Sequence, residues 1–331
     1  MSKLKLTLIS LLIIALVSIA GFFTFNSFQN KSSKIGSIAK NQKVRIGYFA
    51  STSSLGVFIA QEKGYFRDQG LDVELVEFQS NNLATDALVR GDIEVSCCGG
   101  IIAPFEANAV SGGSKLKIFT ASNEIKKSPW NQLTVKNNST ASNIKDLDGK
   151  KIGVYPGNFA TPLFKEYLKQ NRLDLAKTEL IQIPIADQLT SLENGRIDAL
   201  FAYEPTISIA QEKQFIKVID SAIFANQHPN TSTASGSIAT KFINENPDRA
   251  KKFVQAMDKA HKFMFDNPAE AASFQVKYSK IDPKIATKAA YPDYYQNTEL
   301  NIEAIQSYTD FLADIGAMKQ KVVVKDLVYK I

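Results

Sequence analysis

Strand-like and helix-like segments alternate twice along this chain, and this alternation limits its possible folds more than any other feature. Val44–Phe49 is rich in β-branched and aromatic residues, and Leu55–Lys63 follows it with the apolar spacing of a helix. The same order restarts at Lys151–Tyr155 and continues to Ile197–Tyr203. Alternation of this kind is typical of parallel βαβ units. The sequence therefore predicts an α/β fold with parallel-rich sheets flanked by helices.

Two distant segments, 87–95 and 191–199, share a helix end, a glycine, an acidic residue and an apolar strand. Any helix–glycine–strand unit has this pattern, and two lobes built on one plan would also have it, so both interpretations stay open. The C-terminal part is mostly helical from Asn246-Pro247 onward, with proline at the first helical position. The apolar stripe within 248–265 indicates core packing rather than a cofactor site.

The net charge of +6 is concentrated at the N-terminus. Residues 1–42 contain five lysines and no acidic residue, which leaves +1 for residues 43–331. A nucleic-acid-binding body would need a basic face of its own, so the nearly neutral body argues against that class. A chain of 331 residues is long enough for two domains.

The first 25 residues have the pattern of an export segment. Lys3 and Lys5 precede an apolar run, Leu6–Phe25. Small residues at 18–20 suit a cleaved signal peptide, whereas the length of the run also suits an uncleaved transmembrane anchor. Both place the body in the periplasm or at the outer face of the cytoplasmic membrane. Residues 26–42 form a polar tether without a cysteine, which excludes a lipoprotein anchor.

The two cysteines, Cys97 and Cys98, are adjacent. Neighbouring strand residues point to opposite faces, so a disulfide between them is geometrically poor, and we expect two small buried residues. A metal or redox pair is the other interpretation. The chain has no Cys-x-x-Cys motif, no histidine cluster and no zinc spacing, so we expect neither a metal nor another cofactor.

Three stretches, taken together, resemble a known family. They are Ile46-Gly-Tyr48 with 64–66 and 70–73, Leu147-Asp-Gly-Lys-Lys-Ile-Gly-Val154 with Pro156-Gly157, and Gly195-Arg-Ile-Asp-Ala-Leu-Phe-Ala-Tyr-Glu-Pro205. Their order and spacing resemble the nitrate/sulfonate/taurine-type solute-binding proteins of ABC importers. That group also includes binders of thiamine-pyrimidine precursors. The resemblance covers about residues 43–320.

This resemblance implies a type II periplasmic-binding-protein fold, in which two α/β lobes are joined by two crossing strands that act as a hinge. Lobe one would be 43–131 plus 235–331, and lobe two would be 132–234. The crossings would be Leu133–Lys136 and Ser232–Ile238. It also implies a monomer that closes around a small polar ligand and delivers it to an ABC permease in the cytoplasmic membrane.

Ligands of open α/β sheets lie beyond the carboxyl ends of the strands, where helices begin. The predicted ligand-binding residues therefore occupy the strand-to-helix turns. They are Phe49, Ser51, Thr52, Ser54, Gln79, Asn81, Gly99, Gly100, Ser122, Gly157, Asn158, Phe159, Ala160, Tyr203 and Glu204. Free N–H groups at helix starts favour an anionic group, although these serines and asparagines also suit plain N-capping.

These turns contain no lysine or arginine, so neutral donors and helix dipoles would have to hold an anion. Glu204 would require a cation or an N–H donor if it faces the cleft, and it would need no partner if it faces solvent. Phe49, Phe159 and Tyr203 suit an aromatic wall or the core. The combination favours a small sulfonate or taurine-like zwitterion. A thiamine-pyrimidine precursor or another amino-heteroaromatic is the alternative, and bare nitrate fits less well.

The resembling family also includes pyrimidine synthases that need an active-site histidine and a cysteine-rich motif. His228, His261 and the cysteine pair do not reproduce that motif. No Ser-His-Asp order or Walker loop is present either. We therefore expect no catalytic residues and a binding protein rather than an enzyme. A pyrimidine-synthase-like enzyme and a sensor ectodomain are the alternatives from other classes.

Overall fold

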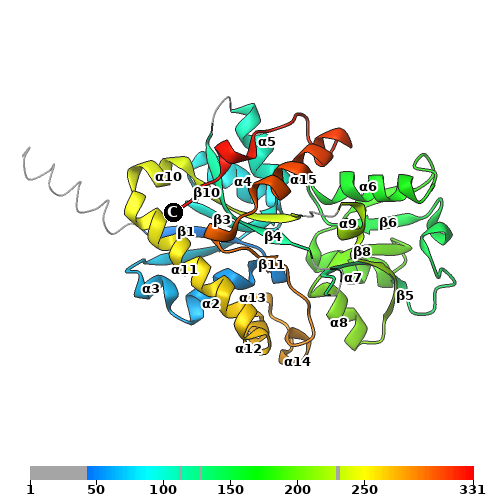
Figure 1. Cartoon of the computed structure of the whole chain (residues 1–331). Helices are drawn as coiled ribbons and strands as arrows, with labels where there is room; N and C mark the ends of the chain where they lie inside the picture. Colours follow the sequence, from blue (N-terminus) through cyan, green and yellow to red (C-terminus); the bar gives the residue numbers. More distant parts are fainter. Residues whose placement is uncertain (1–42, 112–113, 125, 127, 229–231) are drawn as a thin grey trace, which may run out of the picture. The chain divides into compact units, whose positions relative to one another are not determined.

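The computed structural model describes residues 43–111, 114–124, 126, 128–228 and 232–331. The chain divides into two units, 1–43 and 44–331, and the helices and strands described here belong to the second (Figure 1). The predicted signal or anchor and the polar tether lie outside the described residues. Among the helices of the described part, none is both long and apolar enough to cross a membrane.

The first sheet joins strands from both ends of the body, in the order β11-β4-β10-β3-β1-β2. Its strands are β1 (Val44–Tyr48), β2 (Val73–Glu77), β3 (Val95–Gly100), β4 (Leu116–Asn123), β10 (Ala234–Ala239) and β11 (Asp293–Tyr294). Strand β1 is parallel to β2 and β3, whereas β10 is antiparallel to both β3 and β4. Strand β11 adds an antiparallel pair at the edge.

The second sheet repeats this plan, in the order β7-β6-β8-β5-β9. Its strands are β5 (Asn131–Lys136), β6 (Lys151–Val154), β7 (Glu179–Gln182), β8 (Ala199–Tyr203) and β9 (Ile216–Ser221). Strand β6 is parallel to β7 and β8, and β5 is antiparallel to β8 and β9. In each sheet the antiparallel strand beside the parallel set, β10 or β5, is one that the sequence predicted as a crossing.

Helices follow the parallel strands in both sheets (Figure 1). Those after first-sheet strands are α2 (Leu55–Glu62), α3 (Tyr65–Asp68), α4 (Asn81–Arg90) and α5 (Ile102–Val110). Those after second-sheet strands are α6 (Ala160–Gln170), α7 (Ile185–Glu193), α8 (Thr206–Glu212) and α9 (Ile223–Gln227). The C-terminal helices are α10 (Thr240–Glu245), α11 (Pro247–Asp266), α12 (Pro268–Ser273), α13 (Gln275–Ser279), α14 (Pro283–Ala286) and α15 (Ile302–Asp314).

The repeated helix–glycine–strand pattern lies at equivalent places in the two sheets. Gly91 is the C-cap residue of α4 before β3, and Gly195 directly follows Asn194, the C-cap residue of α7, before β8. Their φ angles, 82° and 72°, lie in the left-handed region that favours glycine at the end of a helix. Helix α11 begins with Pro247 as expected and buries its apolar stripe, which includes Phe253 and Met257, against the first sheet and α2.

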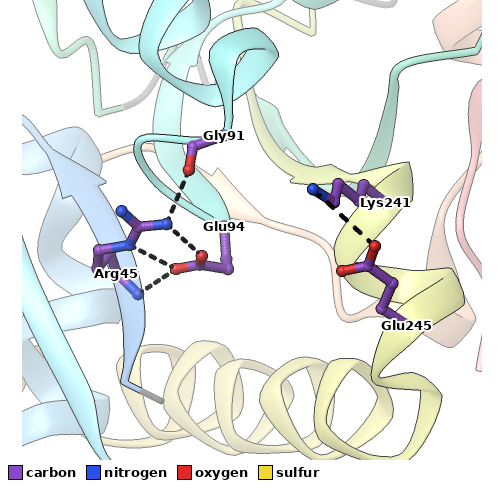
Figure 2. A network of polar contacts seen from close by, with 5 residues as sticks. All are labelled: Arg45, Gly91, Glu94, Lys241 and Glu245. Atoms are coloured by element: carbon purple, nitrogen blue, oxygen red, sulfur yellow. Dashed lines mark hydrogen bonds and ion pairs between the residues drawn. The ribbon is translucent and has the colours of Figure 1, made fainter. Parts of the chain in front are cut away.

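An ion pair holds the amino ends of β1 and β3 together (Figure 2). The Arg45 guanidinium donates to Glu94 Oε1 at 2.6 Å and to the Gly91 carbonyl at 2.8 Å. The Arg45 backbone N–H donates to Glu94 Oε2 at 2.7 Å. The hydrogen bond and the charge of Glu94 raise the pKa of Arg45 further, so its guanidinium stays charged. This network therefore lies at the amino ends of the parallel strands, on the side of the sheet opposite their carboxyl ends.

A buried carboxylate links the end of β4 to the start of β5 and to α9. Glu124 follows β4, is 6% exposed, and accepts hydrogen bonds from the Asn131 side chain and from the Ala225 N–H at 2.7 Å. Asn131 begins β5 and also accepts from the Ile223 N–H at 3.1 Å. Desolvation is the main reason that the pKa of Glu124 rises to about 7, against the opposing effect of these hydrogen bonds. The outgoing crossing is therefore fastened to α9, which precedes the return crossing.

We expect Glu94→Gln to lower the free energy of unfolding by about 1–3 kcal/mol, because charge-assisted hydrogen bonds to Arg45 are lost. Urea denaturation followed by circular dichroism measures this change. The matched control is Glu245→Gln, which removes the exposed ion pair with Lys241 at 3.9 Å, also drawn in Figure 2. It should cost less than about 0.5 kcal/mol. Equal effects of the two substitutions would contradict a special role for Glu94.

Glu124 should make stability depend on pH. Its pKa in the folded state is raised above the ordinary value, so its stabilising contribution is complete below about pH 4 and is lost as the pH rises through about 7. Relative to Glu124→Gln, the wild-type free energy of unfolding should fall by about 2–3 kcal/mol between pH 5 and pH 8. If the free energy of unfolding depended on pH in the same way in both proteins, the pH dependence would not come from Glu124.

Candidate functional site

A cavity lies between the carboxyl ends of the parallel strands of the two sheets. The centres of water-sized molecules can occupy about 60 Å³ of it, so it suits a small ligand. The walls come from the turns after β1, β3, β6 and β8, from the first residues of α4 and α7, and from the residues at or just before the starts of β5 and β10. The lining residues are Phe49, Ser51, Ser53, Asn81, Cys98, Gly99, Gly100, Trp130, Tyr155, Pro156, Gly157, Asn158, Phe159, Ile185, Tyr203, Thr233 and Ala234.

The structure brings nine of the predicted binding residues together around this cavity. They are Phe49, Ser51, Asn81, Gly99, Gly100, Gly157, Asn158, Phe159 and Tyr203. The carboxyl-end rule accounts for their position around one space, because equivalent turns of the two sheets face each other there. Their contact with a ligand stays a prediction.

Six other predicted residues do not line the cavity: Thr52, Ser54, Gln79, Ser122, Ala160 and Glu204. Thr52, Ser54 and Ser122 are fully buried in the walls. The Ser54 hydroxyl accepts from the Phe49 N–H and donates to the Cys97 carbonyl, so it shapes the turn after β1. Ala160 begins α6 and is buried. The Gln79 amide donates to Glu77 at the surface.

Sequence reasoning missed eight lining residues: Ser53, Cys98, Trp130, Tyr155, Pro156, Ile185, Thr233 and Ala234. Ser53, Tyr155 and Pro156 stand in or beside predicted turns, so including each whole turn would have found them. Trp130 directly precedes β5, and Thr233 and Ala234 stand at the start of the return crossing. No local pattern marks them, because their position depends on how two distant parts of the chain meet.

Glycine is required at the end of β3, because neighbouring side chains lie too close to the backbone there to leave room for a Cβ atom. A Cβ atom on Gly99 would lie 1.9 Å from Asn81 Oδ1, and one on Gly100 would lie 2.9 Å from the Phe159 side chain. Asn81 Nδ2 also donates to the Gly100 carbonyl at 2.9 Å. Phe159 follows β6, so the backbone of one sheet's turn touches a side chain from the other.

Cys97 and Cys98 form a disulfide, so the expectation of two separate cysteines is wrong. That expectation assumed the alternating side-chain directions of an ordinary strand, whereas the peptide bond between the two residues is cis. Both residues are buried, and Cys98 contributes to the wall of the cavity beside Gly99.

Aromatic rings form the wall supplied by the second sheet and the crossing. Trp130 and Tyr203 stack with their ring centroids 5.0 Å apart, and Tyr155 meets Tyr203 edge-on at 5.7 Å. Burial raises the pKa of Tyr203 well above its usual value, and the charge of Glu124 adds to this effect. Its hydroxyl is therefore protonated at neutral pH and is able to donate a hydrogen bond.

Three buried polar atoms in this wall have no hydrogen-bond partner among the described residues. They are Nε1 of Trp130, the hydroxyl oxygen of Tyr203 and Oδ1 of Asn158. An unsatisfied buried polar group costs about 1–3 kcal/mol, so a ligand that pairs with these atoms would recover that free energy. On the other side of the cavity, the hydroxyls of Ser51 and Ser53 lie 2.7 Å apart at the start of the helical segment that leads into α2.

The lining residues include no aspartate, glutamate, lysine, arginine or histidine. Glu204, the predicted partner for a ligand amine, turns away from the cavity. Its carboxylate accepts hydrogen bonds from the N–H and the hydroxyl of Ser208, both at 3.0 Å. Glu204 was predicted to line the cleft, and it does not. Its carboxylate instead accepts hydrogen bonds from Ser208 in the first turn of α8.

Contacts between the two sheets' turns continue beside the cavity. Asn158 Nδ2 donates to Glu106 Oε2 of α5 at 2.5 Å. The Tyr155 hydroxyl donates to the Gln79 carbonyl at 3.5 Å. The described arrangement is thus one in which the two sides of the cleft touch.

The chain is similar to proteins that are named as binding proteins and to proteins that are named as synthases. The chain is 28% identical over 299 residues to a protein of Bacillus subtilis (strain 168) whose name describes it as an aliphatic sulfonates-binding protein, covering 87% of this chain and 86% of that one. It is 22% identical over 248 residues to a 4-amino-5-hydroxymethyl-2-methylpyrimidine phosphate synthase of Saccharomyces cerevisiae, covering 72% and 70%.

Solved structures show the same fold. The alkanesulfonate-binding protein SsuA from Xanthomonas axonopodis pv. citri, bound to MOPS, matches with a TM-score of 0.71 and 18% identity, covering 87% of this chain and 98% of that one. The periplasmic nitrate-binding protein NrtA from Synechocystis PCC 6803 matches with a TM-score of 0.67 and 14% identity, covering 86% and 84%. The two sheets and the crossing strands are thus those of a type II periplasmic-binding-protein fold. The family described as NMT1/THI5-like matches residues 51–271, and the chain belongs to that family.

Proposed function

We propose that this chain is the extracytoplasmic solute-binding component of an ABC importer and that it holds a small sulfonate in the cavity between its sheets. The observation that carries this proposal is the unpartnered donor pair, Trp130 Nε1 and the Tyr203 hydroxyl, in a wall without charged side chains. A sulfonate presents three acceptor oxygens and binds well to neutral donors. Ser51 and Ser53 provide further hydroxyls on the opposite side.

The same geometry favours a sulfonate with an uncharged tail over a taurine-like zwitterion. A buried ammonium group is costly without an anionic partner. Glu204 does not line the cavity, and Asn158 Oδ1 is the unpartnered buried acceptor among the lining side chains of the described residues. One neutral acceptor offsets little of that cost. The aromatic rings of Phe49, Tyr155 and Phe159 suit an apolar tail.

An amino-heteroaromatic ligand, such as a thiamine-pyrimidine precursor, is the second candidate. The stacked pair Trp130 and Tyr203 offers planar aromatic surface, and Asn158 Oδ1 suits an exocyclic amino group. A pyrimidine ring would also use the two free donors through its ring nitrogens. Ligand titration separates the two candidates.

The other parts of the proposal rest on the N-terminal pattern and the family. The basic, apolar N-terminus supports export to the periplasm or to the outer face of the cytoplasmic membrane. Similarity to binding proteins of import systems, one named as the ligand-binding component of an ABC-type import system from Staphylococcus aureus, supports delivery to a permease. That the chain acts as a monomer stays an expectation from the sequence. Binding would draw the two sheets together by hinge closure. The hydrogen bond from Asn158 to Glu106 joins the two sides of the cleft and would form as the cleft closes. No turnover is proposed, because tyrosines are the only titratable groups among the described lining residues.

Calorimetric titration of the full chain tests the ligand class. The panel is ethanesulfonate, butanesulfonate, taurine, nitrate and 4-amino-5-hydroxymethyl-2-methylpyrimidine. We expect the alkanesulfonates to bind most tightly. Tyr203→Phe should weaken their binding about tenfold to a hundredfold, because one donor to a charged group is lost. Tyr308→Phe is the matched control, since the Tyr308 hydroxyl is also buried and unpartnered but lies outside the cavity.

Two outcomes would count against the sulfonate. Tight binding of the pyrimidine alone would establish the second candidate in its place. Equal effects of Tyr203→Phe and Tyr308→Phe on sulfonate affinity would show that the hydroxyl of Tyr203 does not contact the ligand.

Gly100→Ala tests whether binding requires the cleft to close. The added Cβ would lie 2.9 Å from Phe159, a contact made only when the turns after β3 and β6 meet. We expect at least a tenfold loss of ligand affinity with little change in the urea midpoint, because opening the cleft relieves the clash. A large loss of stability with unchanged affinity would contradict this interpretation.

A further inference from the structure

Glu204 lies at the boundary between the two sheets, although its side chain points away from the ligand cavity. Its backbone N–H donates to the Trp130 carbonyl at 3.0 Å, which ties it to the cavity wall. Its carboxylate faces a second crevice, and the residues that line this crevice are Ser128, Pro129, Gln132, Glu204, Ser208, Gln211, Glu212, Lys288 and Ala290. Glu204 is nevertheless buried, with only 4% of the residue exposed.

Much of the cover over Glu204 comes from the part of the chain that joins the first sheet. Ala290, which precedes β11, lines this crevice together with Glu204, and its backbone N–H lowers the pKa of the carboxyl. The Thr52 N–H, beside the serines of the cavity, lies 3.5 Å from the Glu204 carbonyl oxygen. Lys288 and Glu212 form an ion pair of 2.6 Å across the same crevice. Ser208 belongs to α8, the helix that begins two residues after Glu204, and would move with it.

We propose that Glu204 couples closure of the cleft to uptake of a proton, so that the closed form is favoured at acidic pH. The inference rests on the proposed function, because it assumes a binding protein that opens and closes. Separating the sheets would remove Ala290 and Thr52 from Glu204 and admit water to the carboxylate. Closing reverses this, and the carboxylate then loses its water while keeping only neutral donors.

The electrostatics support this direction. Burial is the main reason that the pKa of Glu204 rises to about 7, and the hydrogen bonds from Ser208 and Ala290 oppose it only in part. In the open form the carboxyl would return towards its ordinary pKa of about 4. The preference for the closed form is therefore complete below the open-form pKa and is lost as the pH rises through about 7.

Few charges face Glu204 from the elements packed against it. Helix α8 brings Glu212 and the segment before β11 brings Lys288, and these two groups neutralise each other. The neighbouring residues of the crossing that the structure describes, Ser128 and Gln132, are uncharged. Thr52 contributes no titratable group. Proton uptake is thus assigned to Glu204 itself.

Distance measurement without ligand tests the inference on the full chain. Spin labels on Val110→Cys in α5 and Lys169→Cys in α6 report the separation of the sheets, and both positions are well exposed. The native cysteines are joined to each other and do not take up label. We expect the closed-to-open ratio at pH 5.5 to exceed that at pH 8.5 by about thirtyfold. Glu204→Gln should hold the ratio constant.

Two further variants make the test specific. Ser208→Ala removes one donor to the carboxylate and should move the midpoint of the transition to higher pH. Glu124→Gln should keep the wild-type pH dependence, because both hydrogen-bond partners of Glu124, Asn131 in β5 and Ala225 in α9, belong to the second-sheet side and would stay together when the sheets separate. A ratio in the wild type that does not change with pH would overturn the inference, as would an unchanged dependence in Glu204→Gln or its loss in Glu124→Gln.

Ligand binding separates this inference from the proposed function. A panel compound that binds should do so about thirtyfold more weakly at pH 8.5 than at pH 5.5. If no compound binds while the ligand-free distances change with pH as expected, the proposed ligand class fails and the role of Glu204 stands. If sulfonates bind with the same affinity at both pH values, the proposed function stands and the role of Glu204 fails.

Discussion

Both sheets depend on the antiparallel insertion of a crossing strand. β10 pairs with β3 and β4 in the first sheet, and β5 pairs with β8 and β9 in the second. Neither insertion is possible until distant parts of the chain have met, because β10 returns to the first sheet only after the whole second sheet. The same two segments carry Trp130, Thr233 and Ala234 into the cavity wall, so the pairing that completes the sheets also builds the site.

Local physics made much of the fold predictable. The alternation of strands and helices, Pro247 at the start of α11 and the helix–glycine–strand repeat at Gly91 and Gly195 are each visible in a few neighbouring residues. The order of strands was not visible, because it depends on pairing between segments far apart. The disulfide of Cys97 and Cys98 was not predicted for another reason. The prediction assumed the trans peptide bond of an ordinary strand, whereas the bond between these two residues is cis.

The candidate site was also predictable only in part: its turns could be located from the sequence, but the directions of its side chains could not. The carboxyl-end rule found the turns, and Gly99 and Gly100 are glycines because a side chain or a neighbouring turn occupies the space of a Cβ atom. The rule says nothing about where a side chain points within a turn. Glu204 illustrates the difference, since its backbone borders the cavity wall while its carboxylate is held by Ser208 on the far side. Trp130 shows the converse, because it stands on no strand-to-helix turn.

The absence of charged side chains among the described lining residues has a consequence for kinetics. A site that recognises an anion through neutral dipoles alone exerts little long-range attraction on it, so diffusion without steering would set the rate of encounter. Screening by dissolved ions would then change the association rate very little. A receptor built this way would collect its ligand equally well from dilute and from saline surroundings.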